Sequence, residues 1–117
     1  MSDWSAGYVI ETGYTYGYYE DMNPIRVKYI LTYLGYSPIA FEKCFELGIG
    51  QGISVNIHSL TSDADWYGND LNPDQVVFAK ELAKITGANL TDQSFQEISE
   101  DVTLPNFDFI CLHGIWS

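Results

Sequence analysis

Basic residues are scarce in this chain. Of its 117 residues only five are Lys or Arg, whereas 16 are Asp or Glu, so the formal net charge is −11. An electric field of that sign repels phosphate backbones, which argues against a nucleic-acid partner. The same charge suits a cationic ligand, although this preference alone is weak.

Long apolar runs and frequent cysteines are also missing. No run approaches the roughly 20 residues that span a bilayer, and the opening "MSDWSAGYVIE" has no basic region followed by an apolar stretch. We therefore expect a cytoplasmic protein without a membrane segment. The two cysteines, Cys44 and Cys111, each lie in an apolar run and lack the spacing of a metal motif. We expect two buried, reduced thiols and no metal site.

The composition suits one globular domain, with 46% apolar and 18% charged residues. Near the N-terminus, "GYTYGYYE" carries tyrosines at alternate positions. Such a pattern is typical of packing, and the alternative is a lid over a ligand. We divide the chain into an N-terminal lid segment with a helix, residues 1–40, and a domain over residues 41–117.

Two segments begin with the same Asn-Pro pair. "NPIRVKYILTYLG" predicts a helix that Asn23 caps and Gly35 ends, and "NPDQVVFAKELAKITG" predicts another between Asn72 and Gly87. Helical spacing predicts one apolar face on each. These faces comprise Val27, Ile30, Leu31 and Leu34 in the first helix and Phe78, Leu82 and Ile85, expected to be buried, in the second.

Strand-like segments alternate with these helices, which is typical of a parallel α/β sheet with right-handed crossovers. Strands 41–47 and 107–112 are apolar enough to be buried on both faces. The remaining expected elements are a short helix carrying Ile53, Val55, Ile57 and Leu60, a strand ending at Asp70, a short strand over 88–90 and a helical turn over 94–99.

The stretch "FELGIGQG" places three glycines and an acid, Glu46, at the end of the first strand. In a parallel sheet, ligands bind beyond the carboxyl ends of the strands, where glycines let the backbone approach them. The next helix offers free N–H groups and a positive dipole end. About 20 residues later, Asp70 ends the second strand and could accept hydrogen bonds from ribose hydroxyls. This pattern predicts a cofactor that contains a nucleoside.

Two cofactors share this geometry. A dinucleotide site favours Gly-x-Gly-x-x-Gly, but the position of the third small residue is Ile53 here. The charge of Glu46 would also sit poorly beside a pyrophosphate, whereas it suits an ammonium group. S-adenosyl-L-methionine carries an ammonium and a sulfonium and has no phosphate, so the pattern favours it over a nicotinamide dinucleotide.

From about residue 41 onward the chain resembles the class I S-adenosylmethionine-dependent methyltransferases. The similar segments are "FELGIGQG", "WYGNDLNP", "LTDQSFQEI" and "FDFICLHGIW". The resemblance implies a Rossmann-like parallel sheet flanked by helices, with strand order 3-2-1-4. The complete family fold has seven strands in the order 3-2-1-4-5-7-6, so we expect residues 41–117 to form the first half of a cofactor-binding domain that is truncated before strands 5–7.

The resemblance also implies roles for single residues. Glu46 and the glycine loop would hold the methionine portion of the cofactor, Asp70 the ribose, and Asp92 the adenine amino group. Tyrosines ahead of the first strand would form a lid. The implied cofactor-binding residues are Glu46, Gly48, Ile49, Gly50, Gly52, Asp70, Leu71, Asp92, Gln93, Ser94, Tyr14, Tyr16 and Tyr19.

We expect different roles for the two histidines. His113 follows the fourth strand, where a neutral imidazole could take a proton from a substrate, although a structural or solvated histidine is the alternative. We expect His58 to be structural or exposed.

Several functions remain open. We expect the methyl acceptor to be a small molecule or a protein. Methyltransferases of amide and exocyclic nitrogens often carry Asn-Pro-Pro-aromatic after the fourth strand. This chain has "LHGIW" there, which argues against such acceptors. The alternatives are a non-catalytic S-adenosylmethionine-binding module and an NAD-dependent oxidoreductase half-domain. Strand 107–112 would form an apolar sheet edge without protecting charges, so we expect self-association through it. Whether the chain is active alone is left open.

Overall fold

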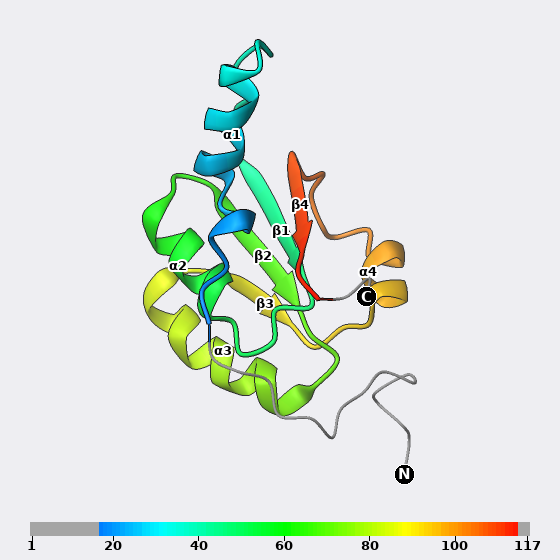
Figure 1. The fold of residues 1–117 in the computed structure, drawn as a ribbon. Coiled ribbons are helices and arrows are strands. Elements are labelled where there is room, and N and C mark those ends of the chain that lie inside the picture. The colour runs from blue at the N-terminus through cyan, green and yellow to red at the C-terminus, as the bar shows by residue number, and fades with distance from the viewer. Residues whose placement is uncertain (1–16, 115–117) are drawn as a thin grey trace.

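The computed structural model describes residues 17–114. Helices and strands alternate in the expected order (Figure 1). The elements are η1 (Glu20–Met22), α1 (Pro24–Tyr33), β1 (Lys43–Leu47), α2 (Ile53–Thr61), β2 (Asp65–Asn69), α3 (Pro73–Thr86), β3 (Asn89–Thr91), α4 (Phe95–Glu100) and β4 (Phe109–Leu112).

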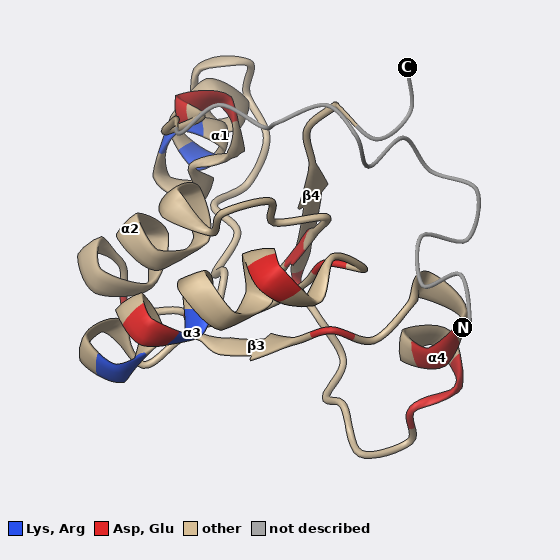
Figure 2. Cartoon of the chain, turned by 90° about the horizontal axis from the view of Figure 1, so that it is seen from below, with Lys and Arg blue, Asp and Glu red and all other residues tan. Residues whose placement is uncertain are grey.

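The four strands form one parallel sheet in the order β3-β2-β1-β4, which confirms the expected topology. In the centre, Glu46 of β1 lies opposite Gly68 of β2 and Cys111 of β4. Figure 2, viewed from the side on which the strands end, shows α2 and α3 on one side of the sheet and α4 on the other. The architecture is therefore a Rossmann-like α/β fold.

Both Asn-Pro pairs begin helices as expected. The Asn23 side chain accepts a hydrogen bond from the N–H of Ile25 (2.9 Å), and that of Asn72 accepts one from Asp74 (3.0 Å). These bonds satisfy amides that have no partner within a helix. α3 ends at Gly87, whose φ of 83° is a left-handed conformation that suits glycine.

The predicted buried stripe of α3 is wrong. The helix buries Val76 and Ala79, whereas Phe78 is exposed, Leu82 is half-buried and Ile85 is 80% exposed. Small side chains face the core because α3 packs closely against α2, and Ala79 lies at that contact. A large side chain in the same place would hold the two helices apart.

The apolar face predicted for the first helix is partly solvent-exposed. Ile30 and Leu34 are exposed, whereas Val27 and Leu31 are half-buried. α1 packs against η1 and projects beyond the sheet (Figure 1). Within residues 17–114 no helix combines the length and apolar composition needed to cross a membrane.

Burial differs between β1, which is central, and β4, which is at the edge of the described sheet. β1 is buried at Cys44, Phe45 and Glu46, as predicted. The prediction for the fourth strand is wrong, because β4 exposes Ile110 and Leu112 and buries only Cys111. β4 forms an edge of the described sheet, so one of its flanks has no neighbouring strand there.

The two faces of the sheet have separate aromatic clusters. On the α2 side, the fully buried Trp66 lies 5.0 Å from the His58 ring, centroid to centroid. On the opposite face, Phe107 contacts Phe45 and Tyr67. Cys44 and Cys111 are buried, free thiols, as predicted, and burial raises the pKa of Cys44 to about 11.

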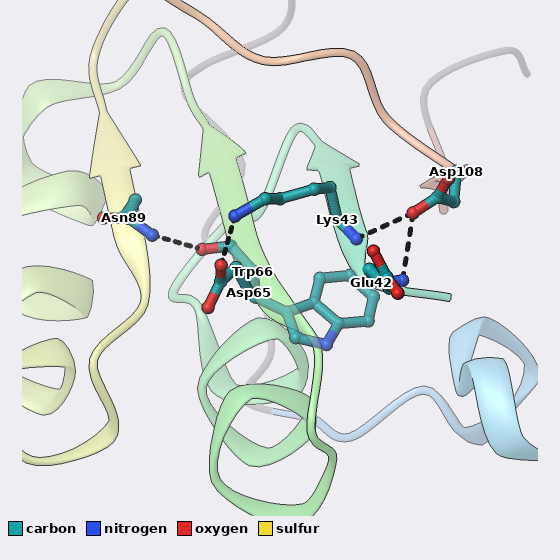
Figure 3. A network of polar contacts seen from close by, with 6 residues as sticks. All are labelled: Glu42, Lys43, Asp65, Trp66, Asn89 and Asp108. Atoms are coloured by element: carbon teal, nitrogen blue, oxygen red, sulfur yellow. Dashed lines mark hydrogen bonds and ion pairs between the residues drawn. The ribbon is translucent and has the colours of Figure 1, made fainter. Parts of the chain in front are cut away.

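A polar network joins the strands at their amino ends (Figure 3). The Asp108 carboxylate accepts hydrogen bonds from the backbone N–H groups of Glu42 and Lys43, each 3.0 Å long. The Lys43 ammonium forms an ion pair with Asp65. Beside them, the Asn89 side chain donates to the Trp66 carbonyl (3.1 Å). Opposite charges are therefore paired at this end of the sheet.

Candidate functional site

The glycine loop between β1 and α2 depends on backbone conformations that other residues rarely adopt. Gly48, Gly50 and Gly52 have φ values of 68°, 59° and 77°. A Cβ at Gly52 would lie 2.5 Å from the Cβ of Ala79, so this glycine also permits α2 to pack on α3. At Gly50, no described atom lies within 4 Å of a Cβ position. The middle of the loop is therefore open to a ligand.

Three successive N–H groups of this loop bond to the end of β2. The N–H of Gly48 donates to the side-chain oxygen of Asn69 (3.2 Å), and that of Ile49 donates to its carbonyl (2.8 Å). The N–H of Gly50 donates to Oδ2 of Asp70 (2.8 Å). The loop is thus anchored, and these three donors are already in use.

Glu46 ends in the interior below this loop. The residue is 3% exposed, and its Oε1 atom is buried without a hydrogen-bond partner among the described residues. Burial, together with the negative charge of Asp70, raises the pKa of the carboxyl to about 8. A buried oxygen without a partner is costly, so a donor from outside the described residues would stabilise it.

Asp70 lies beside Glu46 at the same edge of the sheet. Its Oδ1 accepts the N–H of Asn72 (2.9 Å) and its Oδ2 that of Gly50. Desolvation raises the pKa of this half-buried carboxyl, although the two backbone hydrogen bonds lower it. None of the ion pairs within the described residues includes either acid. Figure 2 shows acidic segments near the strand ends and also beside α1, on α3 and on α4, whereas basic segments lie on α1 and α3.

The segment proposed for the adenine follows β3 at the same edge. Asp92 is exposed. The carbonyl of Gln93 accepts from the Asn69 side chain (2.9 Å), and its own side chain donates to Asp101 (3.0 Å). Ser94 caps α4 by a reciprocal pair of hydrogen bonds with Glu97. Gln93 and Ser94 therefore have structural partners, and Asp92 has the most solvent-exposed side chain of the three.

One predicted lid residue lies near the site. The backbone N–H of Tyr19 donates to the Ser54 hydroxyl (2.7 Å), and its ring stacks on that of His113 with centroids 3.7 Å apart. The segment 17–22 thus joins the start of α2 to the end of β4, and Met22 anchors it in the core. Tyr14 and Tyr16 lie outside the described residues.

Leu71 and His113 are partly accessible to solvent. Leu71 is half-buried directly after Asp70, and His113 is exposed. His58 is structural, as expected: it lies between Tyr18 and Trp66, and burial lowers its pKa to about 4.

Sequence reasoning missed two residues of this region. Asn69 bonds to the glycine loop and to the loop after β3, and Ser54 holds the N-terminal segment. The one available signal for Asn69 was a polar residue at the end of a strand, next to the acid in "YGND".

No family model matches the sequence. The chain is 41% identical over 122 residues to Uncharacterized protein sll1526 from Synechocystis sp., an alignment that covers 97% of this chain and 24% of the relative. The chain therefore spans about a quarter of the length of that relative.

Solved structures share the fold. PKMT2 from Rickettsia typhi, in complex with AdoHcy, matches 89% of this chain and 21% of its own, with 24% identity and a TM-score of 0.74. A SAM-dependent methyltransferase from Geobacter sulfurreducens, in complex with S-adenosyl-L-homocysteine, matches 96% and 41%, with 16% identity and a TM-score of 0.52. The described residues therefore have the Rossmann-like fold of the class I S-adenosylmethionine-dependent methyltransferases.

Proposed function

We propose that the protein binds S-adenosyl-L-methionine at the carboxyl end of the sheet and transfers its methyl group to a small-molecule or protein acceptor. One observation carries the proposal. The three N–H groups of residues 48–50 already donate hydrogen bonds to Asn69 and Asp70. Two acids, Glu46 and Asp70, lie beside this loop. Such a site suits a ligand with positive groups and no phosphate.

The residues present fit this cofactor. The unpartnered oxygen of Glu46 can accept a hydrogen bond from an ammonium group. Each oxygen of Asp70 accepts one backbone N–H and has a second lone pair free for a ribose hydroxyl. The open space at Gly50 lets a ligand reach the backbone. Two solved structures with this fold contain AdoHcy, the demethylated product of the cofactor.

When bound, the cofactor supplies an electrophilic methyl group and a good leaving group, so the protein needs no acid for the transfer. What the chain contributes is alignment and the exclusion of water. Tyr19, stacked on His113, is proposed to cover the site from the N-terminal side. His113 is proposed as the group that receives a proton from the acceptor, because it follows the end of β4.

The dinucleotide alternative loses support from the same geometry. A pyrophosphate needs free backbone N–H groups in the glycine loop, and three of these groups already donate to β2. A non-catalytic module would bind the cofactor in the same way and fail to transfer its methyl group. A methyl-transfer assay separates the module from the enzyme.

Titration calorimetry with S-adenosylmethionine, S-adenosylhomocysteine and NAD tests the proposal. We expect the first two to bind and NAD not to bind. Replacing Asp70 by Ala should weaken binding of S-adenosylhomocysteine by about a hundredfold, because a charged acceptor for two ribose hydroxyls is lost.

Asp108→Ala is the matched control. Asp108 also accepts two backbone N–H groups, but at the amino ends of the strands. We expect this variant to bind S-adenosylhomocysteine with unchanged affinity. Equal affinities in the natural protein and in Asp70→Ala, or selective binding of NAD, would refute the proposed function.

A further inference from the structure

We infer that Asn69 is a positioning residue that holds the loops after β1 and β3 in fixed relation on the two sides of the cofactor site. The inference rests on the proposed function, since the first loop is proposed to hold the methionine portion and the second the adenine. Asn69 is 0% exposed, so it does not itself face a ligand from the surface.

Hydrogen bonds from this single residue reach both loops. Its Oδ1 accepts the N–H of Gly48 (3.2 Å), and its Nδ2 donates to the carbonyl of Gln93 (2.9 Å). Its own carbonyl accepts the N–H of Ile49 (2.8 Å). Rotating the amide by 180° would turn an N–H₂ group toward an N–H and an oxygen toward a carbonyl. The two loops therefore determine the orientation of the side chain.

The bonds continue beyond the two loops. The side chain of Gln93 donates to Asp101, which lies at the end of α4. An unbroken series of hydrogen bonds thus runs from the glycine loop through Asn69 and Gln93 to the segment before β4. β3 has only three residues, so a side-chain bond to the loop that follows it forms a large part of that loop's support.

Burial alone gives no reason for an amide at this position. Leucine has a similar shape and would fill the interior at the end of β2 at least as well. It would, however, leave the N–H of Gly48 and the carbonyl of Gln93 without their partner, and both loops would lose a constraint. We therefore expect substitution to affect the placement of both halves of the cofactor.

Calorimetric titration of S-adenosylhomocysteine into Asn69→Leu tests this role. The dissociation constant should rise about tenfold at unchanged stoichiometry, which corresponds to one lost positioning bond. The matched control is Asn89→Leu, since Asn89 also donates to a backbone carbonyl of a neighbouring segment, that of Trp66, but at the amino end of the sheet. Its dissociation constant should stay within about twofold of the natural value.

Urea unfolding of the same variant separates positioning from stability. If Asn69 only stabilised the fold, the apparent dissociation constant would rise by no more than the reciprocal of the folded fraction that urea unfolding measures. A rise no larger than this factor would overturn the inference. An unchanged dissociation constant would overturn it as well and leave the proposed function standing. Failure of the natural protein to bind would refute the proposed function, and this inference with it.

Hydrogen exchange of the natural protein provides a test that does not require the variant to fold. The amides of Gly48 and Ile49 should be protected before any ligand is added, because Asn69 already accepts from both. Exchange of these two amides at the rate of an unstructured loop would overturn the inference.

Discussion

Asp70 and Asp108 make the same number of backbone hydrogen bonds at opposite ends of one sheet, and their pKa values move in opposite directions. Asp108 is exposed, and the N–H groups of Lys43 and Glu42 lower its pKa (Figure 3). Asp70 is half-buried, and desolvation raises its pKa against the effect of Asn72 and Gly50. Solvent access therefore decides the difference.

The two ends also differ in their balance of charge. At the amino ends, Lys43 pairs with Asp65 and lies near Asp108. At the carboxyl ends, Glu46 and Asp70 lie together, and no described ion pair includes them. A fold that only needed stability would gain nothing from placing the buried Glu46 beside the half-buried Asp70 without a basic partner. We therefore expect a cationic ligand to stabilise the protein at the carboxyl end.

We expect the largest difference in stability between glycine substitutions at the two ends of the sheet. Gly52→Ala should lower the free energy of unfolding by about 3 kcal/mol, since a Cβ would overlap Ala79 at a positive φ. Gly87→Ala, at the amino end, should cost only about 1 kcal/mol. Its φ is also positive, but no atom within the described part of the chain lies within 4 Å of the new Cβ. Urea unfolding measures both values.

Equal losses in the two variants would show that α2 and α3 can move apart without cost, contrary to the close contact at Gly52. The side-chain N–H₂ of Asn56 on α2 donates to the carbonyl of Ala79 on α3 (3.2 Å), so separating the helices would also break this hydrogen bond.

Glu46 should make stability depend on pH. Folding raises its pKa from 4.5 to about 8, so its contribution is complete below pH 4.5 and is lost as the pH rises through 8. Between pH 6.5 and 8 the natural protein should lose about 1 to 2 kcal/mol of unfolding free energy. Glu46→Gln should lose much less. His58 contributes only about 0.4 kcal/mol of opposite sign in this window, because its pKa of 6.5 in the unfolded chain lies at the lower edge and folding lowers that pKa to about 4.

The control for this prediction is Glu42→Gln. Glu42 is an exposed acid directly before β1, at the amino end, and the natural pH dependence should persist in its variant. A flat stability profile for the natural protein would mean that Glu46 is ionised and solvated in the folded state, and the contrast between the two ends would fail. Urea titrations at a series of pH values measure the profile.

The arrangement of elements could be predicted because each signal is local. The Asn-Pro pairs at Asn23 and Asn72 begin helices through bonds to residues two positions away. The glycine pattern after β1 is equally local, since each positive φ belongs to one residue. Parallel strands then bring the residues after β1, β2 and β3 to one edge, so the place of the candidate site follows from topology.

Long-range packing and hydrogen bonding could not be predicted in the same way. The bonds of Asn69 join residues 21 and 24 positions apart. The polar residue at the end of a strand is a local signal, but it does not show which distant residues are its partners. The error in α3 has a similar origin. Helical spacing chose Phe78 and Ile85, but the close approach of α2 selected the face with Ala79. The partner of a helix face determines which residues it buries.

The smallest expected effect on the free energy of unfolding concerns β4, an edge strand that runs from the amino end of the sheet to its carboxyl end. Ile110 is 58% exposed on this edge strand, and we expect self-association through it. Ile110→Lys should shift the mass measured by light scattering at micromolar concentration toward the monomer. Because the side chain is already largely in water, the unfolding free energy should change little.

Val102→Lys is the control for this edge. Val102 is 96% exposed in the segment between α4 and β4, so it presents as much apolar surface without belonging to a strand. Its variant should associate as the natural protein does, because strand pairing needs the free backbone groups of an edge as well as apolar side chains. A natural protein that is already monomeric would refute association through β4. An equal effect of both substitutions would instead attribute the association to general surface hydrophobicity.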